Sequence, residues 1–187
     1  MEAIKPGDIV WDVGANIGMY TELFCQMVGE NGSVVAFEPL PASCEQIRAR
    51  IPNCSWLRIE NIALADEDRP GQLVMHENSY ENHIQSDGSD SGDSVPVQIC
   101  RGDSIVERLG GVPNVVKVDV EGFEEEVLQG MQKMLEAPAL RSLLIEVHFL
   151  KLEMRGRATA PTRIAKLLTS KGYRTTWVDA SHLFAER

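Results

Sequence analysis

The feature that most constrains the fold of this chain is a sharp turn near its start, Gly14-Ala15-Asn16-Ile17-Gly18. The turn follows Asp8–Val13, a short β-branched segment typical of a buried strand. After it, apolar residues recur at helical spacing, at Ile17, Tyr20, Leu23, Phe24, Met27 and Val28. A strand that turns directly into a helix leaves free backbone N–H groups and the positive end of a helix dipole at one spot. The turn therefore predicts a ligand site at the edge of a sheet.

The rest of the chain alternates strands with helices. The expected strands are Ser33–Phe37, Ser55–Ile59, Val115–Val120, Ser142–Val147 and Tyr173–Val178. The expected helices are Pro41–Arg50, Glu124–Leu135 and Pro161–Lys171. Such alternation indicates an α/β fold, with a mostly parallel, doubly wound sheet flanked by helices on both faces. No internal repeat is visible, and we expect residues 1–187 to form a single domain.

One region interrupts the alternation before the fourth strand. Leu73–His76 and Val95–Ile99 are predicted to form a small β-hairpin insertion. Between them lies the acidic, glycine-rich stretch SDGSDSGDS, residues 86–94. We interpret this stretch as a mobile surface loop, with a lid that orders over a bound substrate as the alternative.

Composition excludes several classes of function. A net charge of −10 argues against a nucleic-acid partner, because affinity for nucleic acids comes from clustered Lys and Arg. The sequence has neither an apolar run of membrane-spanning length nor a signal peptide, so we expect no membrane association. The cysteines are scattered without a C-x-x-C pair, which argues against a zinc site and favours a reduced, cytoplasmic protein.

The spacing of the turn discriminates between cofactors. A dinucleotide fingerprint, G-x-G-x-x-G, starting at Gly14 would need glycines where the chain has Asn16 and Met19. Asparagine is one of the few residues other than glycine that tolerates a left-handed backbone. The G-K-[ST] ending of a phosphate-binding loop is also absent. With Asp12 expected at the mouth of the site, a cationic ligand is favoured, and a sulfonium group points to S-adenosylmethionine.

The second strand ends in Phe37-Glu38-Pro39, which places an acid just beyond the carboxyl edge of the sheet. A carboxylate there can accept hydrogen bonds from both hydroxyls of a ribose. NAD would use the same acid, so Glu38 alone does not choose between the cofactors. An NAD-dependent oxidoreductase therefore remains an alternative.

Five segments, in the order DVGANIG, AFEP, NIALAD, VKVDVEGFE and LLIEVH, resemble the FkbM-type S-adenosylmethionine-dependent methyltransferases over nearly the whole chain. The resemblance implies a Rossmann-like class I methyltransferase fold and O-methylation of a hydroxyl on a sugar or small natural product. It implies that Asp12, Gly14, Asn16 and Gly18 line the methionine and ribose part of the cofactor and that Glu38 holds the ribose. It also implies that the turn Asn61–Asp66, with Ala63 at its centre, borders the adenine, and that Asp119 lies beside the methionine end.

Transfer of a methyl group to a hydroxyl needs a base near the carboxyl ends of the fourth and fifth strands. Asp119, Glu146 and His148 are the candidate catalytic residues, with His148 the preferred base because imidazole titrates near neutral pH. These three side chains could share a divalent ion, but nothing in their spacing demands one, and we predict no metal. The expected partner is a small-molecule acceptor, and a homo-oligomer is compatible with the sequence. A non-catalytic cofactor-binding or interaction module is the third alternative, favoured if the three side chains face away from any pocket.

Overall fold

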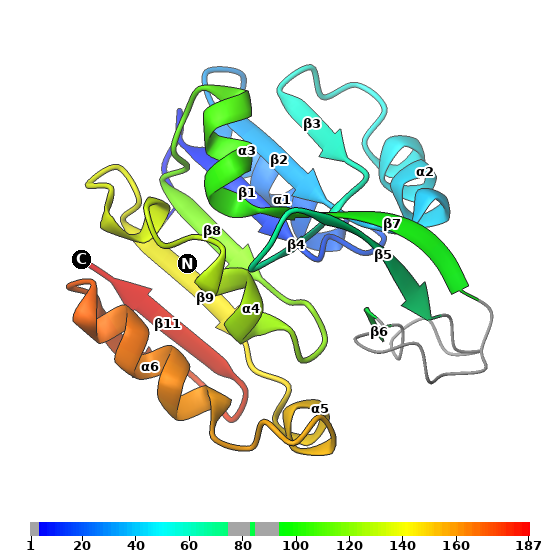
Figure 1. Ribbon diagram of the computed structural model, residues 1–187. Helices are drawn as coiled ribbons and strands as arrows, with labels where there is room; N and C mark the ends of the chain where they lie inside the picture. Colours follow the sequence, from blue (N-terminus) through cyan, green and yellow to red (C-terminus); the bar gives the residue numbers. More distant parts are fainter. Residues whose placement is uncertain (1–3, 75–82, 85–93) are drawn as a thin grey trace.

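The computed structural model describes residues 4–74, 83–84 and 94–187. Its main sheet has seven strands in the order β10-β11-β9-β8-β1-β2-β3 (Figure 1). Their bounds are Ile9–Val13 (β1), Ser33–Phe37 (β2), Leu57–Glu60 (β3), Val115–Val118 (β8), Ser142–Glu146 (β9), Arg174–Trp177 (β10) and His182–Glu186 (β11). Only β11 runs antiparallel to its neighbours, so the sheet is the mostly parallel, doubly wound one that the sequence predicts.

Helices cover both faces of this sheet. On one face, α1 (Met19–Val28) and α2 (Pro41–Arg50) pack against alternate side chains such as Val10, Val34 and Ala36. On the other face lie α3 (Gly102–Leu109), α4 (Glu124–Gln129) and α6 (Ala160–Ser170), over a core that includes Trp11 and Phe37. The short α5 (Phe149–Met154) follows β9. Because successive strand residues point to opposite faces, each buried strand contributes to both cores.

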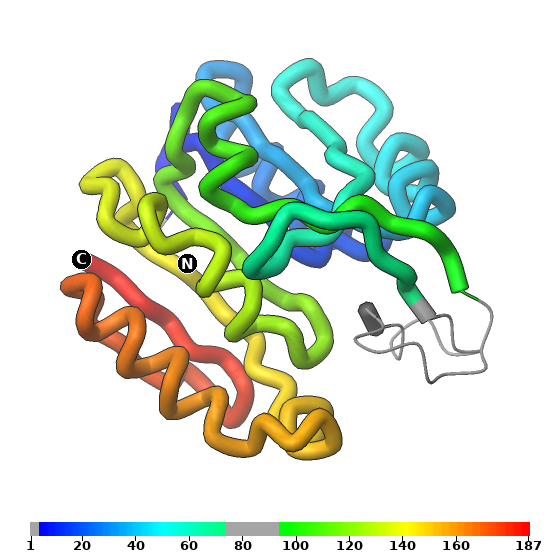
Figure 2. Tube along the Cα trace, viewed as in Figure 1, coloured from blue at the N-terminus to red at the C-terminus, as the bar shows by residue number. Residues whose placement is uncertain are grey.

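A second, four-stranded sheet has the order β4-β7-β5-β6. It contains β4 (Ala63–Ala65), β5 (Arg69–Val74), β6 (His83–Ile84) and β7 (Ser94–Arg101). The antiparallel pair β5 and β7 is the predicted hairpin, although β5 begins at Arg69 rather than Leu73. Figure 2 shows this segment passing beside the main sheet before the chain returns to α3. Residues 75–76 of the predicted strand, and residues 86–93 of the predicted loop, lie outside the described residues.

Several boundaries differ from the predicted ones by one or two residues, as in β3, which covers Leu57–Glu60 rather than Ser55–Ile59, and two departures are larger. The helix expected over Glu124–Leu135 ends at Gln129, and a separate 3-10 helix covers Met134–Glu136. At Gly130 the chain crosses β4 so closely that a Cβ atom would lie 1.9 Å from the carbonyl oxygen of Ala65. The second departure is β11, which inserts between β9 and β10, whereas the expected series of strands ended at Val178. Within the described ranges, every helix is too short or too polar to traverse a bilayer.

Candidate active site

The turn after β1 adopts the left-handed backbone that its glycines and Asn16 permit. Gly14 and Gly18 have φ of 83°, and Asn16 has φ of 49°, as expected for an asparagine in the left-handed region. The N–H groups of Gly14 and Ala15 both donate to the carbonyl oxygen of Phe37. The turn is thereby fixed against the end of β2, and its next N–H group, that of Asn16, reaches Glu38.

Glu38 is held in one orientation by two backbone groups. The N–H of Asn16 donates to its Oε2 and the N–H of Leu40 donates to its Oε1, each at 2.9 Å. Burial raises the pKa of Glu38 to about 7, although the hydrogen bonds from Leu40 and Asn16 oppose that shift. Each carboxylate oxygen has a second lone pair, so Glu38 can still accept hydrogen bonds from a ligand.

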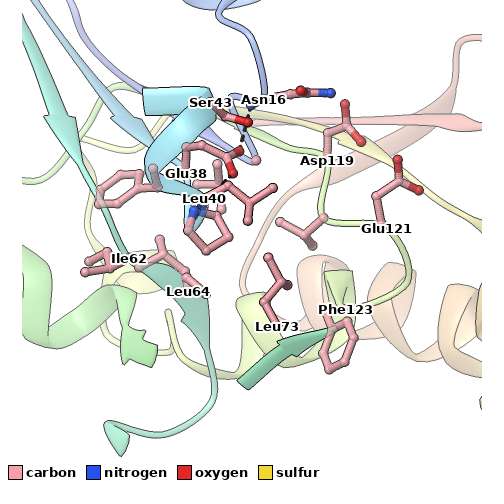
Figure 3. A pocket seen from close by; sticks show the side chains of 16 residues that line it. Asn16, Glu38, Leu40, Ser43, Ile62, Leu64, Leu73, Asp119, Glu121 and Phe123 are labelled. Carbon is pink, nitrogen blue, oxygen red and sulfur yellow. Dashed lines mark hydrogen bonds between the residues drawn. The ribbon is translucent and has the colours of Figure 1, made fainter. Parts of the chain in front are cut away.

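A pocket opens over Glu38 between the two sheets (Figure 3). Its apolar wall comes from β4, β5 and the segment after β8, with Ile62, Leu64, Leu73 and Phe123 among the lining residues. Gly14, Asn16 and Glu38 line it from the strand ends, and Asp119 and Glu121 lie at its far side. Of the predicted adenine turn, Ala63 lines the pocket. The pocket thus has an apolar end, a carboxylate at its middle and an acidic end.

Asp12 lies elsewhere than expected. Its side chain is fully buried beneath α1, where the hydroxyl of Thr21 donates to Oδ2 at 2.6 Å. Because side chains alternate along β1, Val13 rather than Asp12 lines the pocket. The expectation that the Asp12 carboxylate stands at the mouth of the ligand site is therefore not met.

Lys117 links this buried acid to the acidic end of the pocket. Its Nζ lies 3.7 Å from Asp12 Oδ1, 3.0 Å from Asp119 Oδ2 and 4.6 Å from the centre of the Tyr20 ring. Burial alone would lower the pKa of Lys117, but the charges of Asp12 and Asp119 outweigh it and raise the pKa. Lys117 is therefore a buried cation that fixes the orientation of Asp119.

Three other predicted cofactor-binding residues, Gly18, Asn61 and Asp66, do not line the pocket. Gly18 packs against Ile47, and the side-chain amide of Asn61 donates to the carbonyl oxygens of Glu38 and Pro39. Asp66 is exposed and does not line the pocket. Asn61 therefore supports the loop that carries Glu38, whereas Asp66 has no contact with the pocket.

The predicted catalytic residues come together at the ends of β8 and β9. One ligand atom from each of Asp119, Glu146 and His148 lies within 4.8 Å of the other two. His148 Nε2 is 3.6 Å from Asp119 Oδ1 and 4.0 Å from Glu146 Oε1. Glu146 also faces His182, whose Nε2 lies 3.4 Å from Glu146 Oε2. Since Asp119 also lines the pocket, this cluster adjoins the ligand site rather than facing away from it.

Two further acids of the stretch VKVDVEGFE, which are not among the three candidate catalytic residues, complete this cluster. Glu121 has φ of 56°, and its Oε2 lies 3.1 Å from His148 Nε2 and 2.7 Å from Lys151 Nζ. Glu124 is buried and its Oε1 lies 2.7 Å from His148 Nδ1. Burial lowers the pKa of His148, but the hydrogen bond with Glu124 and the surrounding carboxylates raise it more. Lys117 and Lys151 offset part of the negative charge of these acids, and the prediction of no metal stays a prediction.

A crevice of this kind, at the reversal of strand order between β1 and β8, is where open α/β sheets bind their ligands. The fold and the site together define a class I methyltransferase-type domain. Residues 12–175 match the family model for the methyltransferase FkbM domain, and the chain belongs to that family.

Two relatives illustrate the similarity in sequence. The chain is 31% identical over 150 residues to the hexuronic acid methyltransferase AglP of Haloferax volcanii, covering 79% of this chain and 59% of the relative. It is 27% identical over 176 residues to the 31-O-demethyl-FK506 methyltransferase FkbM of Streptomyces tacrolimicus, covering 78% and 67% respectively. The chain thus spans about three fifths to two thirds of the length of these relatives.

Solved structures show the same fold at lower identity. The methyltransferase FkbM from Methylobacillus flagellatus superposes with a TM-score of 0.66 at 14% identity, covering all of this chain and 49% of that one. Fibrillarin from Aeropyrum pernix, solved with S-adenosyl-L-methionine, gives a TM-score of 0.57 at 13% identity, covering 98% and 67%.

Proposed function

We propose that this protein is an S-adenosylmethionine-dependent methyltransferase that transfers a methyl group to a hydroxyl of a sugar or small natural product. The observation that carries the proposal is the position of Glu38, a buried carboxylate between an apolar wall and a base-containing cluster. The names of the relatives are in keeping with it, because one describes a hexuronic acid methyltransferase and the other a 31-O-demethyl-FK506 methyltransferase.

The residues of the pocket fit the parts of this cofactor. The lone pairs that Glu38 has left can accept two ribose hydroxyls, and hydrogen bonds to a charged acceptor contribute about 1.5–3 kcal/mol each. Ile62, Leu64 and Leu73 form an apolar wall that suits the flat adenine ring. Asp119, at the opposite side, would attract the ammonium group of the methionine part.

When bound, S-adenosylmethionine supplies a methyl group that is already activated on a sulfonium centre. The protein then has to orient the acceptor and remove its proton. We assign Nε2 of His148 as the atom that accepts the proton of the acceptor hydroxyl, since the imidazole lies beside Asp119 and Glu146 at the acidic end of the pocket. These carboxylates can hold the acceptor by hydrogen bonds from its hydroxyls, so Asp119, Glu146 and His148 form the proposed catalytic set.

Calorimetric titration with S-adenosylhomocysteine, S-adenosylmethionine and NAD tests the proposal. We expect micromolar affinity for the first two and a rise in melting temperature, since ligand at a hundred times its dissociation constant adds about 2.7 kcal/mol of stability. A screen of neutral sugars and hydroxylated natural products with methyl-labelled cofactor then identifies the acceptor. Binding of NAD without binding of S-adenosylhomocysteine would instead favour an oxidoreductase.

A further inference from the structure

We propose that Glu124 is a positioning residue that holds the imidazole of His148 with its proton on Nδ1 and with Nε2 turned toward the acceptor. The identity of the acceptor rests on the function proposed above. The orientation of the imidazole is a separate property that can be measured without any acceptor.

The contact between the two side chains is short and sheltered from water. Glu124 is the first residue of α4 and is fully buried, and its Oε1 lies 2.7 Å from His148 Nδ1. The same oxygen accepts a hydrogen bond from the N–H of Gly122 at 2.8 Å. An ionised carboxylate can only accept, so a neutral His148 must carry its proton on Nδ1 to make this hydrogen bond.

The opposite nitrogen faces a different set of groups. Nε2 lies 3.1 Å from Glu121, 3.6 Å from Asp119 and 4.0 Å from Glu146. Those carboxylates have other neighbours as well: Lys151 lies beside Glu121, Lys117 beside Asp119 and His182 beside Glu146. A neutral imidazole with its proton on Nδ1 presents the lone pair of Nε2 to the space among these acids. That is the nitrogen that the proposed reaction needs free.

The two following acids on the helix show that contact with His148 is specific to Glu124. Glu125 is paired with Arg157 and Arg163, and Glu126 with Arg155 and Arg157. All three glutamates are buried, so replacing Glu125 or Glu126 with glutamine removes the same charge from a similarly buried position. Glu126→Gln is therefore the control for Glu124→Gln.

The test is a long-range ¹⁵N–¹H correlation spectrum of histidine-labelled protein, recorded across a pH titration and assigned with a His148→Gln sample. In the wild type, neutral His148 should show a protonated Nδ1 and an unprotonated Nε2. Glu124→Gln removes the negative charge beside Nδ1, although its amide oxygen can still accept a hydrogen bond there, and should lower the pKa of His148 by about one unit or more. Glu126→Gln should leave both the tautomer and this pKa as in the wild type.

Two results would overturn the proposal: a wild-type ring with its proton on Nε2, or a Glu124→Gln spectrum indistinguishable from the wild type. If Glu124→Gln does not fold, the wild-type spectrum alone decides. Titration of each sample with S-adenosylhomocysteine separates this proposal from the preceding one. Absence of binding in the wild type would refute the methyltransferase function, while the tautomer of His148 would still be read directly.

Discussion

The carbonyl oxygen of Asp119, at the end of β8, lies 1.7 Å from the point that a Cβ atom on Gly14 would occupy. The turn after β1 and the strand end that carries Asp119 therefore meet only because position 14 has no side chain. This contact brings the turn that lines the ligand pocket against the cluster around His148. Gly14 thus matters for its lack of volume as well as for its positive φ.

Gly14→Ala should strongly destabilise the protein. The new methyl group would meet the backbone of Asp119, which has little freedom to move, and we expect a loss of more than about 3 kcal/mol in the free energy of unfolding. Gly110→Ala is the control, because Gly110 also has a left-handed backbone, with φ of 75°, but has no atom within 4 Å of the new Cβ. That variant should lose only about 1–2 kcal/mol. Equal losses in urea denaturation of both variants would show that the approach of Asp119 is unimportant.

Glu38→Ala should weaken binding of S-adenosylhomocysteine about a hundredfold, which corresponds to about 3 kcal/mol for two hydrogen bonds to a charged acceptor. Isothermal calorimetry measures the change. Glu45→Ala, on the exposed side of α2 where the side chain is 74% exposed, should bind as the wild type does. An unchanged dissociation constant in a folded Glu38→Ala protein would remove Glu38 from the site.

The stability of the ligand-free protein should fall between about pH 4.5 and pH 7 because of Glu38. Its pKa rises from 4.5 to about 7 on folding, so in this range the unfolded chain loses the proton that the folded protein keeps. Below pH 4.5 both states are protonated and there is no effect; above pH 7 the full penalty of about 3 kcal/mol applies. Glu38→Gln cannot ionise, and its stability should decline less over this range. If the free energy of unfolding falls by the same amount between pH 5 and pH 8 in both proteins, the assignment to Glu38 is contradicted.

Lys117→Met should lower the free energy of unfolding by about 3–5 kcal/mol, because it leaves Asp12 and Asp119 beside each other without their shared cation. It should also release Asp119 and weaken binding of S-adenosylhomocysteine. Lys133→Met removes an ion pair with Glu107 at a side chain that is 78% exposed, and should change stability by less than about 1 kcal/mol. Chemical denaturation and calorimetry of both variants provide the comparison.

Local patterns were sufficient for much of the fold and for part of the site. The apolar periodicity of β1 and α1 and the glycines between them define a strand, a tight turn and a helix, and these are properties of neighbouring residues. Glu38 follows a strand directly, so its place at the sheet edge could be read from the chain. Asp119, Glu146 and His148 were expected at adjoining strand ends for the same reason, and the parallel pairing of β8 with β9 brings them together.

Other features depend on contacts between distant segments. Asp12 is buried against Thr21 and Lys117 because the opposite face of β1 is turned toward the pocket. No pattern within the strand indicates which face that is. Likewise, Glu124 reaches His148 across 24 positions in the chain. The apolar wall of the pocket exists only because the second sheet packs beside Phe123.

The sequence by itself therefore determined most of the elements, the parallel class of the sheet and the residues at its carboxyl edge, because these follow from local patterns: apolar periodicity, glycines in turns and the ends of strands. The tertiary structure alone decided which of those residues face the pocket and which hold one another in place. The reason is physical: the direction and partners of a buried side chain are set by the elements packed against it.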